Sequence, residues 1–352
     1  MSGGAPILEV KGLHTSSLKN INLTVSSSGI VAVAGPDIHG KTELINAIAG
    51  LTKYEGTILL EGVSLEDLQT REGKIGYTFH KPMPDANVLT NVALNLKPLG
   101  LPENEVMEKA GEALKALGIE ELGGKTPKEL SIFDLKLFEL ACITAPSPRV
   151  ILLKEPFEGL SLEEKHLLGE ALRTLKQKHP ILLTSRLMSD VDTLADRILL
   201  LNEGEVIQSG HPSELLFEPA NKAVSNITCG GNVFTVITTT IIASGLALVN
   251  CGKNLIFTVP YEKGRIEKVA VYPEGVKVFK HKPKNLTFNS FKASVQAVNE
   301  KNGDVDLQLG LVGGGDLTAR LSKAIAKASK ISKEDQVYAW IDPAYIRTLI
   351  RL

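Results

Sequence analysis

The residues best suited to chemistry lie at 35–42, where the chain reads Gly-Pro-Asp-Ile-His-Gly-Lys-Thr. In the pattern G-x-x-x-x-G-K-T, backbone N–H groups surround phosphate oxygens, the lysine reaches the outer phosphates and the threonine hydroxyl can hold Mg²⁺. These two roles fall on Lys41 and Thr42. We therefore predict a nucleotide site formed by Gly35, Pro36, Asp37, Ile38, His39, Gly40, Lys41 and Thr42.

The segments on either side of this loop are those that the chemistry requires. An apolar, β-branched run at 30–34 predicts a buried strand that leads into the loop. A helix starting near Lys41 would aim its positive end at the same anion, and an apolar face at Leu44, Ile45 and Ile48 would hold that helix against a sheet. A chance match in a glycine-rich loop would need neither element, so the functional interpretation is favoured.

The order of elements predicts two domains. Residues 1–218 alternate short apolar strands with amphipathic helices, which is typical of a layered α/β domain with a mostly parallel sheet. After Pro219 the sequence pattern changes to strand-like runs broken by Gly and Asn, which predicts a mainly β domain over 219–352. Strands are expected at 30–34, 74–78, 150–153, 181–184, 255–259, 269–272, 291–298 and 305–311, and helices at 103–117 and 162–178.

Composition excludes several classes of protein. A net charge of −1, from 39 basic and 40 acidic residues without a basic stripe, argues against nucleic acid as a partner. Three widely spaced cysteines predict neither a zinc site nor a disulfide framework. The first residues lack the charged start and apolar core of a signal peptide, so we expect the chain to stay inside the cell. The apolar run 233–249 is broken by threonines and predicts β-strands instead of a membrane span.

Further motifs follow in the order of an ATP-binding cassette (ABC) ATPase. Residues 150–157, Val-Ile-Leu-Leu-Lys-Glu-Pro-Phe, resemble its Walker B strand, and 195–206 and 210–215 are similar to the end of such a cassette. Residues 219–352 resemble the OB-like TOBE/MOP regulatory domain of importer ATPases for sugars, sulfate and molybdate. The resemblance implies a P-loop NTPase cassette with a helical subdomain, followed by a β-rich regulatory domain.

This chain departs from the family at most catalytic positions. Lys154 stands where the resemblance places the Asp that holds Mg²⁺, either through decay of the site or as a replacement positive charge. Glu155 matches the carboxylate that polarises the attacking water and is the one catalytic candidate. Ser185 replaces the His that touches the γ-phosphate, and His80 replaces a metal-sensing Gln. His80 is a weak candidate metal ligand, although a lone His is more often a polar surface residue.

Three further positions bear on nucleotide binding. The family signature L-S-G-G-Q survives only as Leu-Ser-Ile-Phe-Asp at 130–134, so Ser131 is the one phosphate-contacting residue retained there. The segment that carries an adenine-stacking aromatic in the family is shortened, and His14 is the only ring in place. Thr42 remains a weak metal ligand. The expected cofactor is ATP, with Mg²⁺ possible but weakened.

These features predict a degenerate nucleotide-binding subunit of an ABC importer. We expect it at the cytoplasmic face of the membrane, bound to transmembrane permease subunits and paired with a second, more orthodox ATPase subunit. Hydrolysis by this chain alone is expected to be weak or absent, because two copies would form sites that lack both the metal Asp and the signature.

Two alternatives remain open at this point. One is a regulatory module that senses an oxyanion and uses the cassette to dimerise; Thr-Phe-Asn at 287–289 departs from the Ser-x-Arg-Asn pattern of such sites. The other is a weak homodimeric ATPase of a molybdate/tungstate-type importer, which Mg²⁺-dependent turnover by the isolated chain would distinguish. The transported substrate and the identity of the partner do not follow from the sequence.

Overall fold

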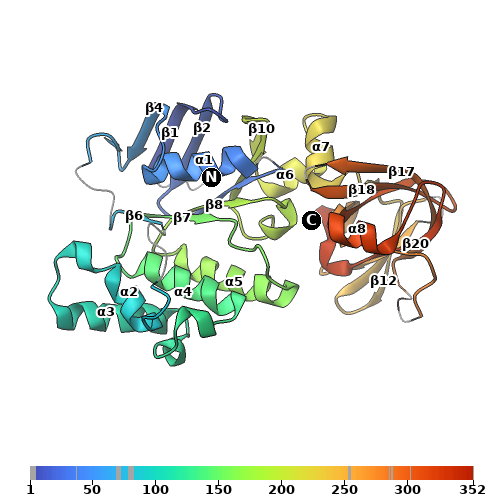
Figure 1. Cartoon of the computed structure of the whole chain (residues 1–352). Helices are drawn as coiled ribbons and strands as arrows, with labels where there is room; N and C mark the ends of the chain where they lie inside the picture. The colour runs from blue at the N-terminus through green and yellow to red at the C-terminus, as the bar shows by residue number, and fades with distance from the viewer. Residues whose placement is uncertain are drawn as a thin grey trace. The chain divides into compact units, whose positions relative to one another are not determined.

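The computed structural model describes residues 5–36, 38–68, 73–77, 83–252, 255–284, 286, 288–301 and 303–351, with only the backbone of residues 38, 39 and 301. The chain divides into two compact units, Met1–Gly210 and His211–Leu352 (Figure 1). The predicted boundary at 218/219 assigns residues 211–218 to the first domain, whereas by contacts this stretch belongs to the second unit.

The first unit is built on a six-stranded sheet of order β10-β9-β3-β8-β7-β6. Neighbouring strands are parallel except β9 and β10, as expected for a layered α/β domain. β3 is buried along its whole length between β8 and β9, which explains its continuous apolar sequence. The strands are β3 (Ile30–Ala34), β6 (Ile75–Gly76), β7 (Val150–Lys154), β8 (Ile181–Ser185), β9 (Arg197–Asn202) and β10 (Glu205–Gly210).

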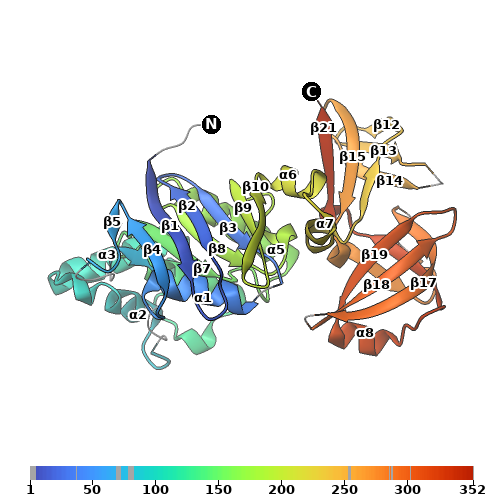
Figure 2. The same cartoon turned by 90° about the horizontal axis from the view of Figure 1, so that it is seen from above.

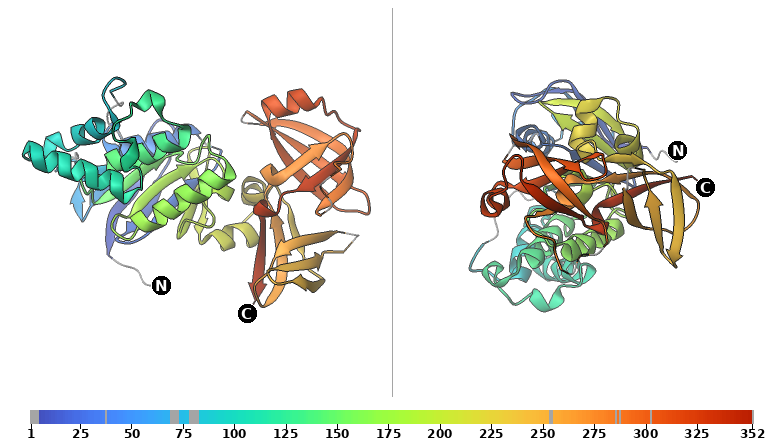
Figure 3. Two further views of the ribbon diagram at one scale, coloured as in Figure 1. Left: turned by 90° about the horizontal axis from the view of Figure 1, so that it is seen from below. Right: turned by 90° about the vertical axis from the view of Figure 1, so that its right-hand side faces the viewer.

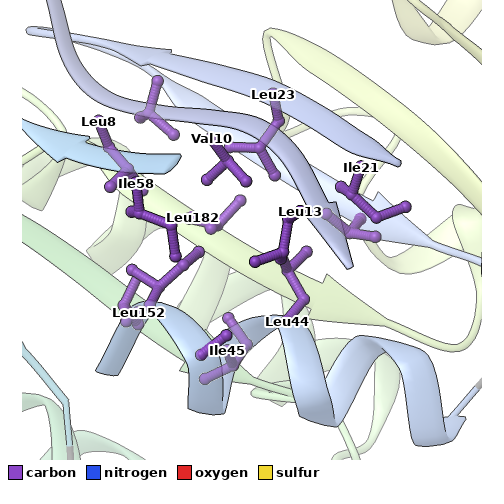
Figure 4. Close-up of a cluster of buried hydrophobic side chains, with 14 of the residues drawn as sticks. Leu8, Val10, Leu13, Ile21, Leu23, Leu44, Ile45, Ile58, Leu152 and Leu182 are labelled. Atoms are coloured by element: carbon purple, nitrogen blue, oxygen red, sulfur yellow. The ribbon is translucent and has the colours of Figure 1, made fainter. Parts of the chain in front are cut away.

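Helix α1 (Ile38–Ala49) joins this sheet to a second, antiparallel one of order β2-β1-β4-β5. Leu44 and Ile45 of α1 lie in one buried cluster with Leu8 and Val10 of β1 and Leu152 of β7 (Figure 4). Burying this cluster supplies the main stabilisation of the helix that carries the phosphate-binding residues. The strands of the second sheet are β1 (Pro6–His14), β2 (Ile21–Ser26), β4 (Glu55–Leu60) and β5 (Val63–Ser64).

A helical part lies between β6 and β8 in the chain and is seen from below in Figure 3. Ser131 and Ser161 begin α4 and α5 with capping boxes, in which each hydroxyl accepts from the backbone N–H three residues on. The helices are α2 (Val88–Leu94), α3 (Glu103–Ala116), α4 (Ile132–Thr144) and α5 (Leu162–Leu175), with 3₁₀ turns η1 (Lys97–Leu99), η2 (Glu120–Leu122) and η3 (Pro127–Glu129); a further 3₁₀ turn, η4 (Met188–Asp190), follows β8.

The second unit is mainly β, as predicted, and every strand pair in it is antiparallel. Its three sheets have the orders β11-β15-β21, β12-β13-β14 and β16-β20-β17-β18-β19 (Figure 2). They share one buried core, in which Phe257 packs against Phe234 and Phe291.

The elements of this unit are α6 (Pro212–Phe217), α7 (Lys222–Cys229), β11 (Val233–Thr235), β12 (Thr238–Ala243), β13 (Leu246–Asn250), β14 (Ile256–Pro260), β15 (Arg265–Val271), η5 (Pro273–Gly275), β16 (Val276–Phe279), β17 (Ser290–Lys301), β18 (Asp304–Leu311), β19 (Asp316–Ser322), α8 (Lys323–Ser329), β20 (Gln336–Ile341), η6 (Pro343–Tyr345) and β21 (Ile346–Arg351).

The run 233–249 forms strands β11, β12 and most of β13, which confirms the β interpretation. Among the described residues, no helix has the length and apolar character needed to cross a membrane.

Candidate phosphate-binding site

The loop between β3 and α1 begins at a position that only glycine can occupy. Gly35 has φ +133°, and a Cβ added there would lie 2.2 Å from the carbonyl oxygen of Leu201. Its N–H donates to the carbonyl oxygen of Ser185 at 3.2 Å, which ties the loop to the end of β8. α1 begins at Ile38, earlier than the predicted start near Lys41, so Gly40, Lys41 and Thr42 lie within its first turns.

Lys41 is the central charged group of the site. Its side chain is 1% exposed, and Nζ donates to the carbonyl oxygen of Gly35 at 2.7 Å. The same ammonium lies 2.8 Å from Oε1 of Glu155. The structure therefore brings together, as an ion pair, the lysine predicted to bind phosphate and the one catalytic candidate.

Glu155 is held at the ends of two neighbouring strands. It follows β7 with φ +46°, an unusual backbone conformation for a residue with a side chain. Its N–H donates to Oγ1 of Thr184 at 3.2 Å, and its Oε2 accepts from the N–H of Arg186 at 2.7 Å. Oε2 thus has a hydrogen-bond donor, whereas among the described residues the buried Oε1 has the ion pair with Lys41 but no hydrogen bond.

Lys154, directly before Glu155, lies in a different environment. It is exposed at the end of β7 and lines a cavity of about 200 Å³ with Tyr77 of the β6 end and Lys136 and Glu139 of α4. Burial raises the pKa of Glu139, and the charge of Lys136 lowers it in part. Within the described part of the chain, the Lys154 ammonium has no hydrogen-bond or ion-pair partner.

Ser185 does not offer its hydroxyl to a ligand. The side chain is 2% exposed, and its Oγ donates to the carbonyl oxygen of Leu187 and accepts from the N–H of the same residue. Nearby, Lys165 pairs with Asp190 at 2.6 Å. Burial raises the pKa of Asp190, while Lys165 opposes that effect.

His14 lies exposed at the end of β1, where its Nδ1 accepts from the N–H of Asn20 at 3.4 Å. The next residues bind Glu43 of α1: both Thr15 and Ser16 donate hydroxyl hydrogen bonds to its carboxylate, and the N–H of Ser17 donates at 3.1 Å. These bonds hold the pKa of Glu43 below its ordinary value, chiefly through Ser16. Residues 15–17, which belong to the segment expected to face an adenine, are therefore held by Glu43 of α1.

Sequence reasoning missed Glu43, although a signal was present. An acidic residue directly after Lys-Thr places a negative charge where the loop is meant to hold an anion. The run Thr-Ser-Ser at 15–17 offers the hydroxyl donors that such a carboxylate needs.

Ser131 makes none of the site contacts described above; it is the exposed N-cap of α4. Its Oγ donates to Oδ2 of Asp134 at 2.8 Å and accepts from the N–H of the same residue at 3.1 Å. Ile132, the first residue of α4, is 56% exposed. The retained serine hydroxyl is thus engaged with a carboxylate.

Some predicted site positions lie outside the described residues. These are Asp37 and His80, together with the side chains of Ile38 and His39. Pro36 is partly buried in the loop and Thr42 is partly buried on α1. Within the described ranges, no group of three or more His, Cys, Asp or Glu side chains could hold a metal ion.

The donor set fits a nucleotide's phosphates. The loop glycine, the first turns of α1 and the Lys41 ammonium supply backbone N–H groups and a cation of the kinds that bind phosphate. Of the groups expected around Mg²⁺, Thr42 supplies a hydroxyl, and the last residue of β7 is the cation Lys154. The fold and site therefore define a P-loop nucleotide-binding protein.

Comparison with known proteins gives the family. The ABC transporter family model matches residues 18–158. The chain is 34% identical over 198 residues to a putative ABC transporter ATP-binding protein of Pyrococcus abyssi, covering 54% of this chain and 75% of that protein. It is 26% identical over 284 residues to the spermidine/putrescine import ATP-binding protein PotA of Aggregatibacter actinomycetemcomitans, covering 77% of this chain and 76% of that protein.

Among solved structures, cbiO1 from Clostridium perfringens, part of the ABC transporter complex cbiONQ, aligns with a TM-score of 0.54 at 25% identity. The alignment covers 60% of this chain and 90% of that chain. The protein belongs to the ABC transporter ATP-binding family.

Proposed function

We propose that this chain is a nucleotide-binding subunit of an ABC importer that retains ATP at its phosphate loop but contributes little hydrolysis by itself. The importer assignment is supported by the names of relatives such as PotA and by a putative 2-aminoethylphosphonate import ATP-binding protein, PhnT, of Salmonella choleraesuis, 28% identical over 291 residues. On this proposal the chain lies at the cytoplasmic face of the membrane against transmembrane permease subunits. The second unit, 211–352, acts as a TOBE/MOP-like regulatory domain.

The observation that carries the proposal is the contrast between Lys41 and its surroundings. Lys41 is intact, buried and positioned at the loop, so phosphate binding is retained. Lys154 stands in place of the metal-supporting carboxylate, and Ser185 uses its hydroxyl within its own turn. Glu155 is left as the sole candidate for activating water, and loss of the other charge-stabilising contacts costs several kcal/mol in phosphoryl transfer.

We further propose that the chain pairs with a second, more orthodox ATPase subunit. ABC cassettes hold ATP between the phosphate loop of one subunit and the signature of the other, so the partner's site would face Ser131. Ile132 and Leu162, at the starts of α4 and α5, are 56% and 47% exposed, and such apolar side chains favour burial against another chain. The partner's nucleotide must then displace Asp134 from the Ser131 hydroxyl.

The test is hydrolysis by the complete transporter, reconstituted with its membrane subunits. Lys41→Ala should weaken ATP retention but leave most transport-coupled turnover, because the working site uses the partner's phosphate loop. Ser131→Arg should stop turnover, since it puts a bulky cation at the contact with the partner's nucleotide. Ser322→Arg, the same change at the N-cap of α8 in the second unit, controls for loss of a helix cap.

Opposite results would contradict the pairing. If Lys41→Ala abolishes turnover while Ser131→Arg behaves like Ser322→Arg, the active site belongs to this chain. If the wild-type chain purifies as a dimer with Mg²⁺-dependent turnover of its own, the homodimeric ATPase is the correct interpretation.

A further inference from the structure

The outer face of the five-stranded sheet in the second unit carries a cluster of aromatic and basic side chains. Trp340 of β20 pairs with Lys277 of β16 on one side, and its neighbour two residues earlier, Tyr338, pairs with Phe279. On the other side, Tyr338 pairs with Lys292 of β17. Directly paired residues of a sheet point to the same face, so these five side chains lie together.

The opposite face of the same strands forms the core. Ala339 and Val337 of β20 and Val276 of β16 are completely buried, whereas Phe279, Tyr338 and Trp340 are partly exposed. The three outer rings do not belong to the core cluster of this unit. Among the described residues, the Trp340 indole N–H and the Tyr338 hydroxyl have no hydrogen-bond partner, and none of the three rings stacks on another aromatic ring.

Positive charge surrounds these rings. From Gly275 to Asn299 the sequence contains no Asp or Glu, and its five lysines are Lys277, Lys280, Lys282, Lys284 and Lys292. Two of them have contacts: Lys277 donates to the carbonyl oxygen of Glu274 at 3.2 Å, and Lys280 lies 3.4 Å from Asp335. Lys282, Lys284 and Lys292 are exposed and have no ion-pair or hydrogen-bond partner in the described part of the chain.

We infer that this face, the Trp340 platform (Lys277, Phe279, Lys292, Tyr338 and Trp340), binds single-stranded nucleic acid. Partly exposed rings on a sheet stack on successive bases, and lysines around them bind the phosphates. The basic segment 280–284 continues directly from Phe279, so the positive charge extends beyond the reach of one phosphate. This favours a chain of nucleotides over a single one.

The inference departs from the expectation drawn from net charge. The net charge of −1 does not reveal the platform, because it sums over the whole chain while the stretch from Gly275 to Asn299 carries five lysines and no acidic residue. The antiparallel register brings Lys277 and Phe279 of β16, Lys292 of β17, and Tyr338 and Trp340 of β20 onto one surface.

The experiment uses the full chain carrying Lys41→Ala, which disables the phosphate loop as a competing site. The probe is a fluorescein-labelled twelve-residue oligothymidylate, followed by anisotropy, and quenching of Trp340, the only tryptophan of the chain, gives a second signal at the platform itself. We expect saturable binding that quenches Trp340. Tyr338→Ala should weaken binding roughly tenfold, and Tyr338→Phe, which keeps the ring, should stay within about twofold of the parent.

The charge contribution is tested by salt dependence. Lys282→Gln should reduce the slope of log K against log salt by about 0.7, the value of one phosphate contact on a single strand. Lys327→Gln on α8 removes an exposed lysine outside the platform and should leave the slope unchanged. Circular dichroism and thermal unfolding of each variant separate loss of binding from loss of fold.

Three results would overturn the inference. One is that thymidine monophosphate binds as tightly as the oligomer, which would make this a mononucleotide site. Another is that polyglutamate or vesicles of anionic lipid quench Trp340 equally, which would assign the surface to acidic partners in general. The third is binding of the oligomer that Tyr338→Ala leaves unchanged.

Discussion

Glu155→Gln should raise the affinity of the chain for ATP and lower its free energy of unfolding. In the nucleotide-free chain, the Glu155 carboxylate lies 2.8 Å from the ammonium of Lys41, whose side chain is 1% exposed. A phosphate that binds Lys41 must approach this carboxylate. Removing the negative charge therefore favours the phosphate, while it also takes from Lys41 its ionic partner.

The magnitudes follow from this geometry. Two unit charges about 4 Å apart interact by about 4 kcal/mol at an effective dielectric constant near 20. Glu155 is 17% exposed and can turn toward water, so we expect about 1–2 kcal/mol of this repulsion to be relieved, a 5- to 30-fold gain in ATP affinity. The free energy of unfolding should fall by about 2 kcal/mol, since Gln still accepts a hydrogen bond but no longer balances a buried cation.

The assay is equilibrium binding of ATP in the presence of a chelator, which prevents metal-dependent hydrolysis, together with denaturant unfolding of the nucleotide-free chain. Glu158→Gln, an exposed position three residues further on, is the matched control and should change neither quantity. If Glu155→Gln leaves affinity unchanged in the chelator, or tightens binding without loss of stability, the Lys41–Glu155 pair does not govern phosphate binding.

Three further predictions follow from single contacts. Gly35→Ala should destabilise the chain by about 3 kcal/mol, because the added Cβ would lie 2.2 Å from the Leu201 carbonyl oxygen. Gly111→Ala, at an open helix position, is the control and should be neutral or stabilising by up to about 1 kcal/mol. Thermal unfolding of both variants checks this. Hydrogen bonds lower the pKa of Glu43 from 4.5, so its stabilisation is complete above that pH and is lost as the pH falls through the lowered value. In denaturant unfolding, Glu43→Gln should therefore have a lower free energy of unfolding than the wild-type chain at pH 7, and this difference should shrink below pH 4.5. A difference that persists at lower pH would exclude ionisation of Glu43 as its cause. Asn289→Ala should lower the free energy of unfolding by about 2–4 kcal/mol, because its amide bonds both the N–H and the carbonyl of Thr258, and the exposed Asn299→Ala should cost little. Equal stability of the two variants would show that the Asn289 amide does not hold β14.

Local patterns predicted much of the fold and the phosphate loop. The strand at 30–34, the helices starting at 103 and 162, and the strands within 233–249 appear in the structure because apolar periodicity and caps determine such elements locally. Of the strand predicted at 74–78, Ile75–Gly76 form β6 at the edge of the sheet, and Thr78 lies outside the described residues.

Contacts between distant segments could not be predicted. The Lys41–Glu155 pair joins residues more than a hundred positions apart, and the hydrogen bonds from residues 15–17 to Glu43 depend on where β1 ends relative to α1. The positions of Ser131 and Ser185 in the sequence likewise did not reveal the partners of their hydroxyls, which donate to Oδ2 of Asp134 and to the carbonyl oxygen of Leu187.

The most direct test of the central claim is to measure ATP binding and ATP turnover on the same preparation of the isolated chain. The account predicts saturable binding that Lys41→Ala abolishes and that a chelator changes by less than about threefold, with turnover at background. Turnover on the order of one per second that requires Mg²⁺ and disappears in Glu155→Gln would contradict it, because this chain would then form a complete active site.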